Sequence, residues 1–238
     1  EAIIALLACS SIGAIWSSCS PDFGIRGVLD RFDQIQPKLL ITSDGYYYKG
    51  KSFSLKDKIK EITNRLPSIE YVICADYIND EISYNERLIK WPEVKDQDIE
   101  INFEQMPFSH PLYIMYSSGT TGKPKSIVHS SGGTLLQHMK ELVLHTDLKR
   151  EDKIFYFTRC GWMMWNWLIS SLSVGATVVL YDGDPFYPEG SSLLKIADDI
   201  GLTIFGTSAK YISYLEEIGI NPKDLYDFKS LRCILSTG

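Results

Sequence analysis

Apolar and polar residues follow two periods along this chain, and the alternation predicts its elements. Within residues 25–36 and 55–67, apolar side chains recur every three or four positions, which is typical of a helix with one buried face. Residues 38–44 and 71–77 are instead compact apolar runs that predict strands. Because strands separated by helices indicate βαβ units, we expect an α/β fold with mostly parallel sheets and flanking helices.

The same alternation predicts elements before and after this stretch. Residues 2–9 are apolar enough for a helix, and residues 14–19 indicate a short buried strand. Gly175 follows one later apolar segment, as glycine commonly does at the end of a helix. In the second half we expect strands over residues 111–116, 126–130, 153–162, 176–183, 203–208 and 232–238, and helices over residues 132–148, 166–174, 192–201 and 209–219.

Residues 80–110 interrupt the alternation. They are polar, rich in Asp, Glu and Asn and punctuated by proline, which predicts a long surface connection with little regular structure. We therefore expect a first α/β subdomain portion over residues 1–110 and a second over residues 111–238. Glu1 already lies in a helical pattern and the last residues run from a strand into a loop, so we expect the chain to be part of a longer protein.

Charge and cysteine content argue against several classes of protein. Across 238 residues, 24 Lys and Arg stand against 30 Asp and Glu, and this net charge of −6 disfavours nucleic acid or an anionic membrane as a partner. The five cysteines are scattered without zinc or disulfide spacing, so we expect reduced thiols and a cytoplasmic protein. The apolar start is short, broken by Cys9, Ser10 and Ser11, and lacks a basic flank, so we expect neither a signal peptide nor a membrane span.

Residues 116–126, YSSGTTGKPKS, concentrate hydroxyls, glycines and lysines directly after a predicted strand. An ordinary surface turn has a similar composition. A phosphate-binding loop needs the same residue types, because glycine lets backbone N–H groups approach oxygens, hydroxyls donate further bonds and lysine supplies charge. The Walker pattern does not fit, since Gly119 and Gly122 are three residues apart and Lys123 precedes Pro124, so an NTPase of the kinase or GTPase type is disfavoured.

With LYIMY before it and IVHSSGG after it, this motif resembles the phosphate-loop signature of the adenylate-forming enzymes, which include acyl-CoA synthetases, luciferases and the adenylation domains of peptide synthetases. Ser126 stands where that family usually has glycine. Near the start of the chain, IGAIWSSCSPDFG resembles short-chain acyl-CoA synthetases, and further on WMMWNWLISSLSVGATVVLYDGDPFYP and FGTSAKY resemble those that activate acetoacetate. The resemblance implies that the phosphates of ATP are bound by Ser117, Ser118, Gly119, Thr120, Thr121, Gly122, Lys123 and Lys125.

The resemblance implies a reaction in two steps. The carboxylate of an acid attacks the α-phosphorus of Mg-ATP to give an acyl-adenylate and pyrophosphate, and the thiol of CoA then displaces AMP to give a thioester. Acetoacetate, ATP and CoA are the expected small-molecule substrates. Catalysis of the first step would rest mainly on positioning and on charge neutralisation at phosphate.

The resemblance also implies an acyl and CoA pocket in the second half. Open α/β sheets bind ligands at the carboxyl ends of their strands. The pocket residues expected by resemblance are Trp162, Met163, Met164, Trp165 and Asn166, together with Gly206, Thr207 and Ser208. Aromatic and Met side chains also fill cores, and Ser208 also suits the N-cap of a helix, so both interpretations stay open. The family loop that reaches the nucleotide begins at Ser236, Thr237 and Gly238.

No catalytic residue and no metal ligand is predicted within this chain. The family's catalytic lysine, its Mg²⁺-binding glutamate and its ribose-binding aspartate are expected outside it, so the chain alone is predicted to be inactive. Asp182, Asp184 and Glu189 have no spacing that indicates a metal site, and we expect them to be solvated. Two alternatives to acetoacetate activation stay open: a ligase for another short acid, such as acetate, propionate or a hydroxybutyrate, and a non-catalytic ligand-binding domain.

Overall fold

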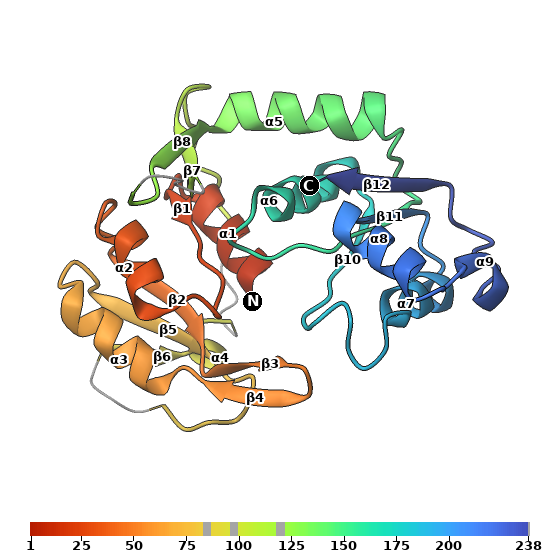
Figure 1. Cartoon of the computed structure of the whole chain (residues 1–238). Helices are drawn as coiled ribbons and strands as arrows, with labels where there is room; N and C mark the ends of the chain where they lie inside the picture. The colour runs from red at the N-terminus through yellow and green to blue at the C-terminus, as the bar shows by residue number, and fades with distance from the viewer. Residues whose placement is uncertain (83–86, 96–99, 118–121, 238) are drawn as a thin grey trace. The chain divides into compact units, whose positions relative to one another are not determined.

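The computed structural model describes residues 1–82, 87–95, 100–117 and 122–237, and its contacts divide the chain into two compact units (Figure 1). Unit 1 comprises Glu1–Tyr47 and Lys51–Gly133, and unit 2 comprises Tyr48–Gly50 and Thr134–Gly238. The predicted division after residue 110 refers to subdomains of a longer protein and stays a prediction. Each unit has helices packed on largely parallel sheets, so the predicted α/β class is confirmed.

Two three-stranded sheets form the frame of unit 1. Strands β2 (Leu39–Ser43), β5 (Tyr71–Ala75) and β6 (Leu88–Lys90) are parallel. In the second sheet, β7 (Pro111–Tyr116) pairs in parallel with β1 (Trp16–Ser17) and antiparallel with β8 (Ser126–Ser130). The antiparallel pairing places Ser126 opposite Tyr116, so the two ends of the glycine-rich motif meet at the end of this sheet.

Helices α1 (Ala2–Ser11), α2 (Ile25–Phe32), α3 (Lys56–Arg65) and α4 (Trp91–Lys95) accompany these sheets. The predicted apolar faces of α2 and α3 are buried in one core with strand β5. Its members include Val28, Leu29 and Phe32 from α2, Ile59 and Ile62 from α3, and Val72 from β5. The helical periodicity of the sequence therefore identified this core. The core anchors the buried face of α2, and the opposite face of the helix is exposed.

Two parts of the first 110 residues were not predicted. Strands β3 (Gly45–Tyr48) and β4 (Lys51–Ser54) are joined at Lys49 and Gly50, which have φ of 50° and 74°, as two-residue turns between strands require. The prediction of little regular structure over residues 80–110 was wrong in part, because this stretch contains β6 and α4. β6 is short and forms by pairing with β5, a contact from outside the segment that its own polar composition does not reveal.

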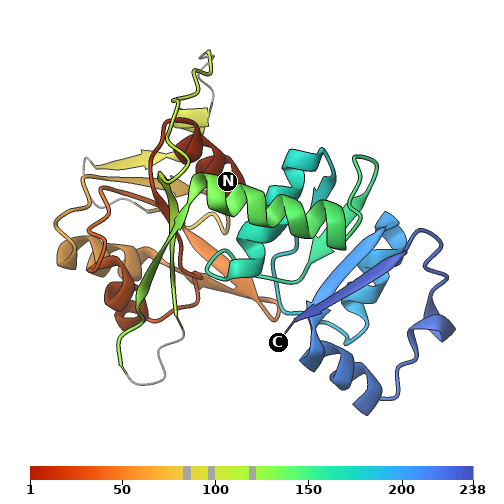
Figure 2. The ribbon, with the colours of Figure 1, turned by 90° about the horizontal axis from the view of Figure 1, so that it is seen from above.

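Unit 2 is built on one parallel sheet of order β10-β9-β11-β12, comprising Thr177–Val179, Lys153–Tyr156, Ile204–Ser208 and Cys233–Thr237 (Figure 2). Alternate residues of the central strands enter two different cores, as the period of a strand requires. Ile154, Tyr156 and Ile204 join α6 (Met163–Ile169) in one core. Phe155 and Phe205 join α7 (Ser192–Ile200) and α8 (Ala209–Glu217) in the other, so the sheet lies between two helical layers.

The boundaries in unit 2 differ from the predictions at the aromatic-Met segment. Strand β9 ends at Tyr156 rather than at residue 162, and α6 begins at Met163, three residues earlier than expected. Helix α5 (Ser131–Met139) continues as the π-helix η1 (Lys140–His145), and the 3-10 turn η2 (Ser170–Val174) extends α6 to Gly175. Gly175 has φ of 87°, which confirms its predicted place at a helix end. The short helix α9 (Pro222–Leu225) was not predicted.

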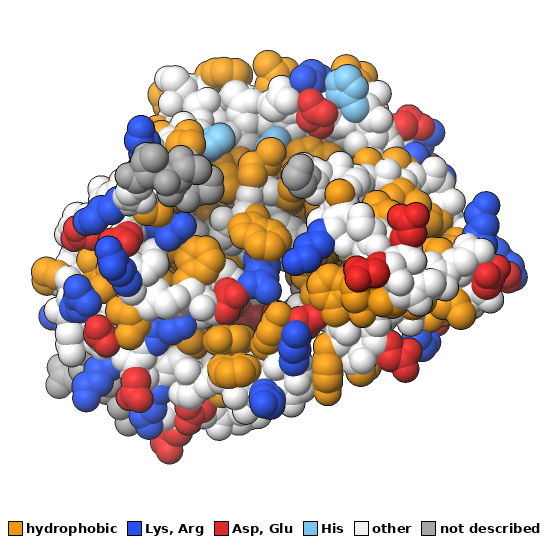
Figure 3. Space-filling view, viewed as in Figure 1, with side chains coloured by type: hydrophobic (Ala, Val, Ile, Leu, Met, Phe, Trp, Pro, Cys, Tyr) orange, Lys and Arg blue, Asp and Glu red, His pale blue; other side chains and the backbone are white. Residues whose placement is uncertain are grey.

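The surface carries charges of both signs. Figure 3 shows Lys and Arg interspersed with Asp and Glu over the visible face, and apolar side chains along the outer edge of the α5 segment. The exposed large apolar residues of α5 and η1 are Leu135, Leu136, Val143 and Leu144. Within the described ranges, none of the helices combines the length and the apolar character needed to cross a membrane.

Candidate nucleotide and acyl sites

Strands β7 and β8 hold the two ends of the glycine-rich motif together. The Ser117 N–H donates to the Lys125 carbonyl at 3.0 Å, and the Lys125 N–H donates to Ser117 Oγ at 3.1 Å. These two bonds extend the β7–β8 pairing and close the base of the loop. Ser117 Oγ still has its own proton to donate, as a phosphate ligand requires. Four residues that the sequence assigned to phosphate, Ser118, Gly119, Thr120 and Thr121, lie outside the described residues.

The lysine-bearing arm of the loop, residues 123–126, projects into solvent. Lys123 and Lys125 are exposed, and a Cβ added to the neighbouring Gly122 would meet no atom of the described residues within 4 Å. The Lys123 ammonium lies 4.0 Å from Asp30 Oδ1 of α2, with its side chain 69% exposed. An ion pair this long and this exposed contributes little to stability. Lys123 can therefore change partner at little cost, which suits a phosphate ligand.

Sequence reasoning missed two residues beside this arm, Asp30 and Gln34. The Gln34 amide donates to the Pro124 carbonyl at 2.7 Å, and its oxygen accepts from Ser126 Oγ at 2.9 Å. The one signal in the sequence was Ser126 itself, a hydroxyl where the family usually has no side chain. Its partner Gln34 could not be found without the tertiary packing that brings the end of α2 beside β8.

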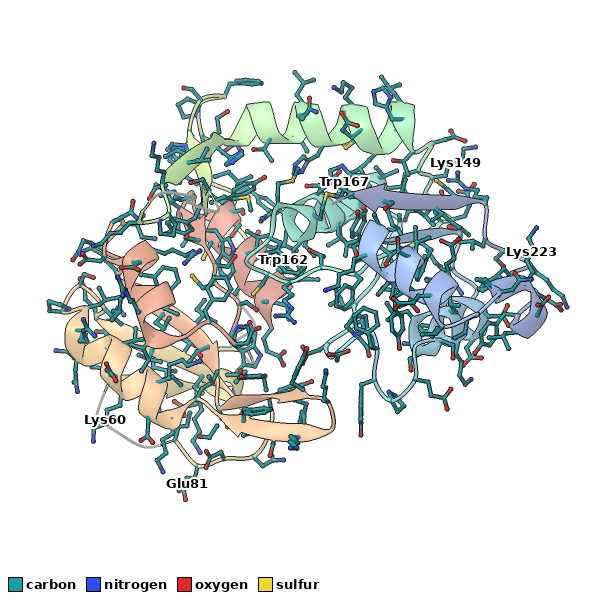
Figure 4. All side chains as sticks on the ribbon, in the orientation of Figure 1. Lys60, Glu81, Lys149, Trp162, Trp167 and Lys223 are labelled. Atoms are coloured by element: carbon teal, nitrogen blue, oxygen red, sulfur yellow. The ribbon has the colours of Figure 1, made fainter. Side chains whose placement is uncertain are left out.

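The aromatic-Met segment, residues 162–166, has an exposed part and a buried part. Trp162 lies just before helix α6, and Trp167 lies within it (Figure 4). Trp162 and Met163 are 46% and 49% exposed, and the Arg159 guanidinium lies over the Trp162 ring at 5.6 Å from its centroid. Trp165 and Asn166 are instead buried, and Met164 packs against the core on this side of the sheet. Trp162 and Met163 are thus at the surface and Trp165 and Asn166 in the interior, and the pocket role of this segment stays a prediction.

At the carboxyl end of β11, the backbone of Gly206 lies very close to the side chain of Tyr156. Gly206 lies beside Tyr156 in the β9–β11 register, and a Cβ on Gly206 would be 2.1 Å from a carbon of the Tyr156 ring. The Tyr156 hydroxyl donates to the Thr207 carbonyl at 3.3 Å, and its ring meets Trp167 edge to face at 6.3 Å. Tyr156 therefore connects the end of β11 to helix α6 and is the second feature that the sequence did not reveal.

The ionisation of Tyr156 follows from this burial. Desolvation raises the pKa of its phenol, while a hydrogen bond with the Thr237 backbone lowers it by a smaller amount. The hydroxyl is therefore protonated at neutral pH and donates its one proton to the Thr207 carbonyl. It links the carboxyl ends of β11 and β12, the two strands whose ends carry predicted site residues.

The remaining predicted residues lie on these same strand ends. Ser236 pairs with Thr207 and Thr237 with Ser208, and both residues of β12 are exposed. Ser208 Oγ accepts from the Tyr211 N–H at 3.2 Å, so Ser208 is the N-cap of α8. Thr207 is 1% exposed, and its Oγ1 has no hydrogen-bond partner among the described residues. Gly238 lies outside the described residues.

The acidic residues of unit 2 do not form a metal site. No group of three or more His, Cys, Asp or Glu side chains suited to a metal ion occurs in the described part of the chain. The expectation that Asp184 is solvated was wrong. Its side chain is buried, accepts from the Phe186 N–H at 2.7 Å and lies 3.7 Å from the Lys49 ammonium. Asp184 therefore orders the loop after β10.

Comparison with known proteins places this arrangement in context. The family model described as AMP-binding enzyme matches residues 1–238. A protein described as acetoacetyl-CoA synthetase from Danio rerio is 49% identical over 248 residues, and one described as acetoacetyl-coenzyme A synthetase from Rhizobium meliloti is 49% identical over 243 residues. Each alignment covers 100% of this chain and 37% of the relative.

A solved structure shares the fold over the whole chain. Acetoacetyl-CoA synthetase from Streptomyces lividans superposes with a TM-score of 0.95 at 44% sequence identity. The superposition covers 100% of this chain and 36% of that protein. The chain therefore spans little more than a third of the length of the relatives that it matches.

Proposed function

The chain belongs to the family of AMP-binding enzymes, and from that premise we propose that the longer protein activates acetoacetate with ATP. Acetoacetate and ATP would give acetoacetyl-adenylate and pyrophosphate, and CoA would then give acetoacetyl-CoA and AMP. The longer protein would thus be an acid–thiol ligase. Because this chain spans 37% of the relatives' length, we propose that it does not catalyse the ligation alone.

The observation that carries this proposal is the loop between β7 and β8. Its base is closed by two hydrogen bonds, and its arm presents two exposed lysines beside Gly122, whose added Cβ would meet none of the described residues within 4 Å. We propose that Lys123 leaves Asp30 for the triphosphate, whose greater charge makes it the stronger partner. Lys125 would supply further charge, and Ser117 and the backbone of Gly122 would supply hydrogen bonds, close to the same triphosphate oxygens.

The end of unit 2 supports the acyl half of the proposal. Trp162 and Met163 offer exposed apolar surface, and Thr207 offers a buried hydroxyl with no partner among the described residues. An apolar lining with few polar groups is typical of small-molecule sites. The described side chains do not fit a Mg²⁺ site, so we derive no step through the metal and keep its ligand outside this chain. The cytoplasmic location and the absence of a nucleic-acid partner stay predictions.

Acid-dependent exchange between ATP and pyrophosphate in the full-length protein tests the proposal. We expect exchange to be strongest with acetoacetate when it is compared with acetate, propionate and 3-hydroxybutyrate. Strongest exchange with another of these acids would keep the ligase and replace the substrate. A folded full-length protein that shows no exchange with any acid would contradict the proposal and favour a binding domain.

Variants in the loop make the same assay specific. Lys123→Ala and Gly122→Val are expected to reduce exchange at least tenfold, because one removes charge and the other adds bulk where phosphate would approach. Lys60→Ala is the matched control, since Lys60 is an exposed lysine of α3 in the same unit (Figure 4). Equal exchange in Lys123→Ala and Lys60→Ala would remove Lys123 from the nucleotide site.

A further inference from the structure

Helix α2 provides a second support for the lysine-bearing arm, residues 123–126. We propose that Gln34 is a positioning residue for ATP: its side-chain amide fixes the arm to the end of α2, and Asp30 holds the Lys123 ammonium until a triphosphate replaces it. This inference rests on the proposed nucleotide role of the loop. Neither residue belongs to the glycine-rich motif, and neither contacts phosphate in this arrangement.

The Gln34 amide has a full set of partners. Its nitrogen donates to the Asp30 carbonyl at 2.6 Å and to the Pro124 carbonyl at 2.7 Å, while its oxygen accepts from Ser126 Oγ at 2.9 Å. Both N–H donors are therefore used on carbonyl oxygens. A rotated amide would place its own oxygen against those two carbonyls, so the bonds permit one orientation. The side chain thus acts as a bridge with a defined direction.

Every residue of the arm has a partner on one of its two flanks. Lys123 pairs with Asp30, and Pro124 and Ser126 bond to Gln34. The Lys125 carbonyl accepts from the Ser117 N–H, and the Lys125 N–H donates to Ser117 Oγ. The arm is consequently held between β7 and α2, and its two lysine side chains project from a fixed backbone. Such preorganisation reduces the ordering cost when a ligand binds.

Asp30 suits the role of a temporary partner. Its Oδ1 is 4.0 Å from Lys123, and its Oδ2 is 3.6 Å from Arg26 Nε, so it keeps a cation when Lys123 leaves. The Arg26 side chain is 93% exposed and the Lys123 side chain 69% exposed, and both pairs are therefore weak. Releasing Lys123 leaves no carboxylate buried without compensation.

The bridge contributes little to the fold itself. Gln34 is exposed, while α2 is anchored by Val28, Leu29 and Phe32 on its opposite side. Removal of an exposed amide should leave the core intact. The bridge therefore predicts a change in ATP affinity without an equal change in stability, and this distinguishes positioning from a structural role.

The test measures ATP affinity by calorimetry on the full-length protein, with melting temperature and pyrophosphate exchange measured in parallel. Gln34→Ala removes two hydrogen bonds to the arm, so we expect the Kd for ATP to rise roughly fivefold to tenfold. The KM for ATP should rise by the same factor while kcat changes less than about twofold. Ser126→Ala removes one bond from the other side and should raise the Kd roughly twofold to threefold.

Two further variants give opposite signs. Gln34→Glu places a carboxylate against two carbonyl oxygens and should weaken ATP binding more than Gln34→Ala. Asp30→Asn removes the competing charge on Lys123 and should tighten ATP binding by about twofold. Gln137→Ala is the matched control, because Gln137 is an exposed glutamine of α5 that donates to Glu141 at 2.9 Å, and it should leave ATP affinity unchanged.

Several outcomes would overturn the inference. An unchanged Kd in both Gln34→Ala and Ser126→Ala would do so, as would a wild-type protein that does not bind ATP. If Gln34→Ala unfolds, Ser126→Ala decides, since it breaks the bridge from β8. A wild type that binds ATP but shows no exchange with any acid refutes the proposed ligase, and the Kd series still tests the bridge.

Discussion

Two regions of the chain place candidate ligand groups by different physical means. The arm of residues 123–126 is held by hydrogen bonds and one long ion pair, all at exposed or half-buried positions. The end of β11 is held by packing: Gly206 lies against the Tyr156 ring, and Tyr156 lies against Trp167. The first support can be exchanged for a ligand, whereas the second cannot move without disturbing a core.

The contrast explains which groups can follow a substrate through a reaction. An exposed lysine with a weak partner can change position at little cost. A tyrosine in a close-packed interior resists displacement, because even one additional methyl group is felt there. We therefore expect changes at the arm to alter ligand affinity, and changes at β11 to alter stability first. The following predictions test that division, in order of decreasing effect.

The largest effect is expected for Gly206→Ala. Its Cβ would lie 2.1 Å from a Tyr156 ring carbon, so the ring or the strand must shift. Overpacking of this kind should cost about 3 kcal/mol of unfolding free energy. Urea denaturation of the full-length protein measures it. A loss below about 0.5 kcal/mol would show that this packing is looser than the structure indicates.

Asp152 and Arg232 of unit 2 form a polar cluster around a buried carboxylate. Like the arm, this cluster is held by hydrogen bonds and an ion pair, so it tests how much burial changes their contribution to stability. Arg232 bonds to Asp152 at 2.6 Å and 3.2 Å, and the side chain of Asp152 is 6% exposed. Arg232→Ala leaves this carboxylate buried without its main partner and should cost about 2 kcal/mol at neutral pH. Urea denaturation of wild type and variant gives the difference, and an unchanged midpoint would contradict it.

The same cluster makes stability depend on pH. Burial would raise the pKa of Asp152, but hydrogen bonds from Arg232, Thr203 and the Lys149 N–H hold this pKa below its ordinary value. Because the folded pKa is depressed, the contribution is complete above the ordinary aspartate pKa of about 4 and is lost as the pH falls through the folded pKa. Arg232→Ala should flatten this acid-dependent part of the stability curve, measured by urea denaturation across pH 3 to 7.

A smaller effect is expected for Tyr156→Phe. It keeps the ring against Gly206 and Trp167 but removes the hydroxyl that donates to the Thr207 carbonyl at 3.3 Å. The loss should be about 1 kcal/mol. Thermal unfolding measures it, and a loss as large as that of Gly206→Ala would mean that the hydroxyl rather than the packing supports β11.

Gly122→Ala should have the smallest effect on stability. Among the residues that the structure describes, a Cβ there meets no atom within 4 Å, so unfolding free energy should change by less than about 0.5 kcal/mol. The substitution matches Gly206→Ala atom for atom, and urea denaturation of the two variants compares the regions directly. Equal losses in both would remove the distinction between a packed and an exposed support.

The sequence predicted those elements whose periodicity is local. Strand β7, strand β8 and helix α2 begin where the apolar pattern begins, and the motif between β7 and β8 identified the family. Strand β6 was missed because pairing with β5, rather than its own composition, creates it. Residues 157–162, predicted to continue β9, form an irregular turn instead, and α6 begins at Met163 because bulky Met and Trp residues suit a helix as well as a strand. Packing of Trp167 on Tyr156 accompanies this helix.

In the candidate site, too, the sequence predicted only the residues that belong to a local motif. The loop residues follow from a contiguous motif, and their roles stay predictions. Gln34 and Tyr156 lie far in sequence from the groups that they support, 90 residues from Pro124 and 51 from Thr207. No local pattern joins such pairs. They become visible only when the strand register is known.

The register that sets Gly206 beside Tyr156 has a consequence for redesigning the end of β11. Two neighbouring strands share the space for side chains here. The Tyr156 ring of β9 occupies the volume that a side chain at Gly206 of β11 would need. A larger residue on one strand therefore calls for a smaller one on the other. Other residues at these two positions should be tolerated as paired exchanges, while libraries that vary either position alone would mostly return unstable proteins.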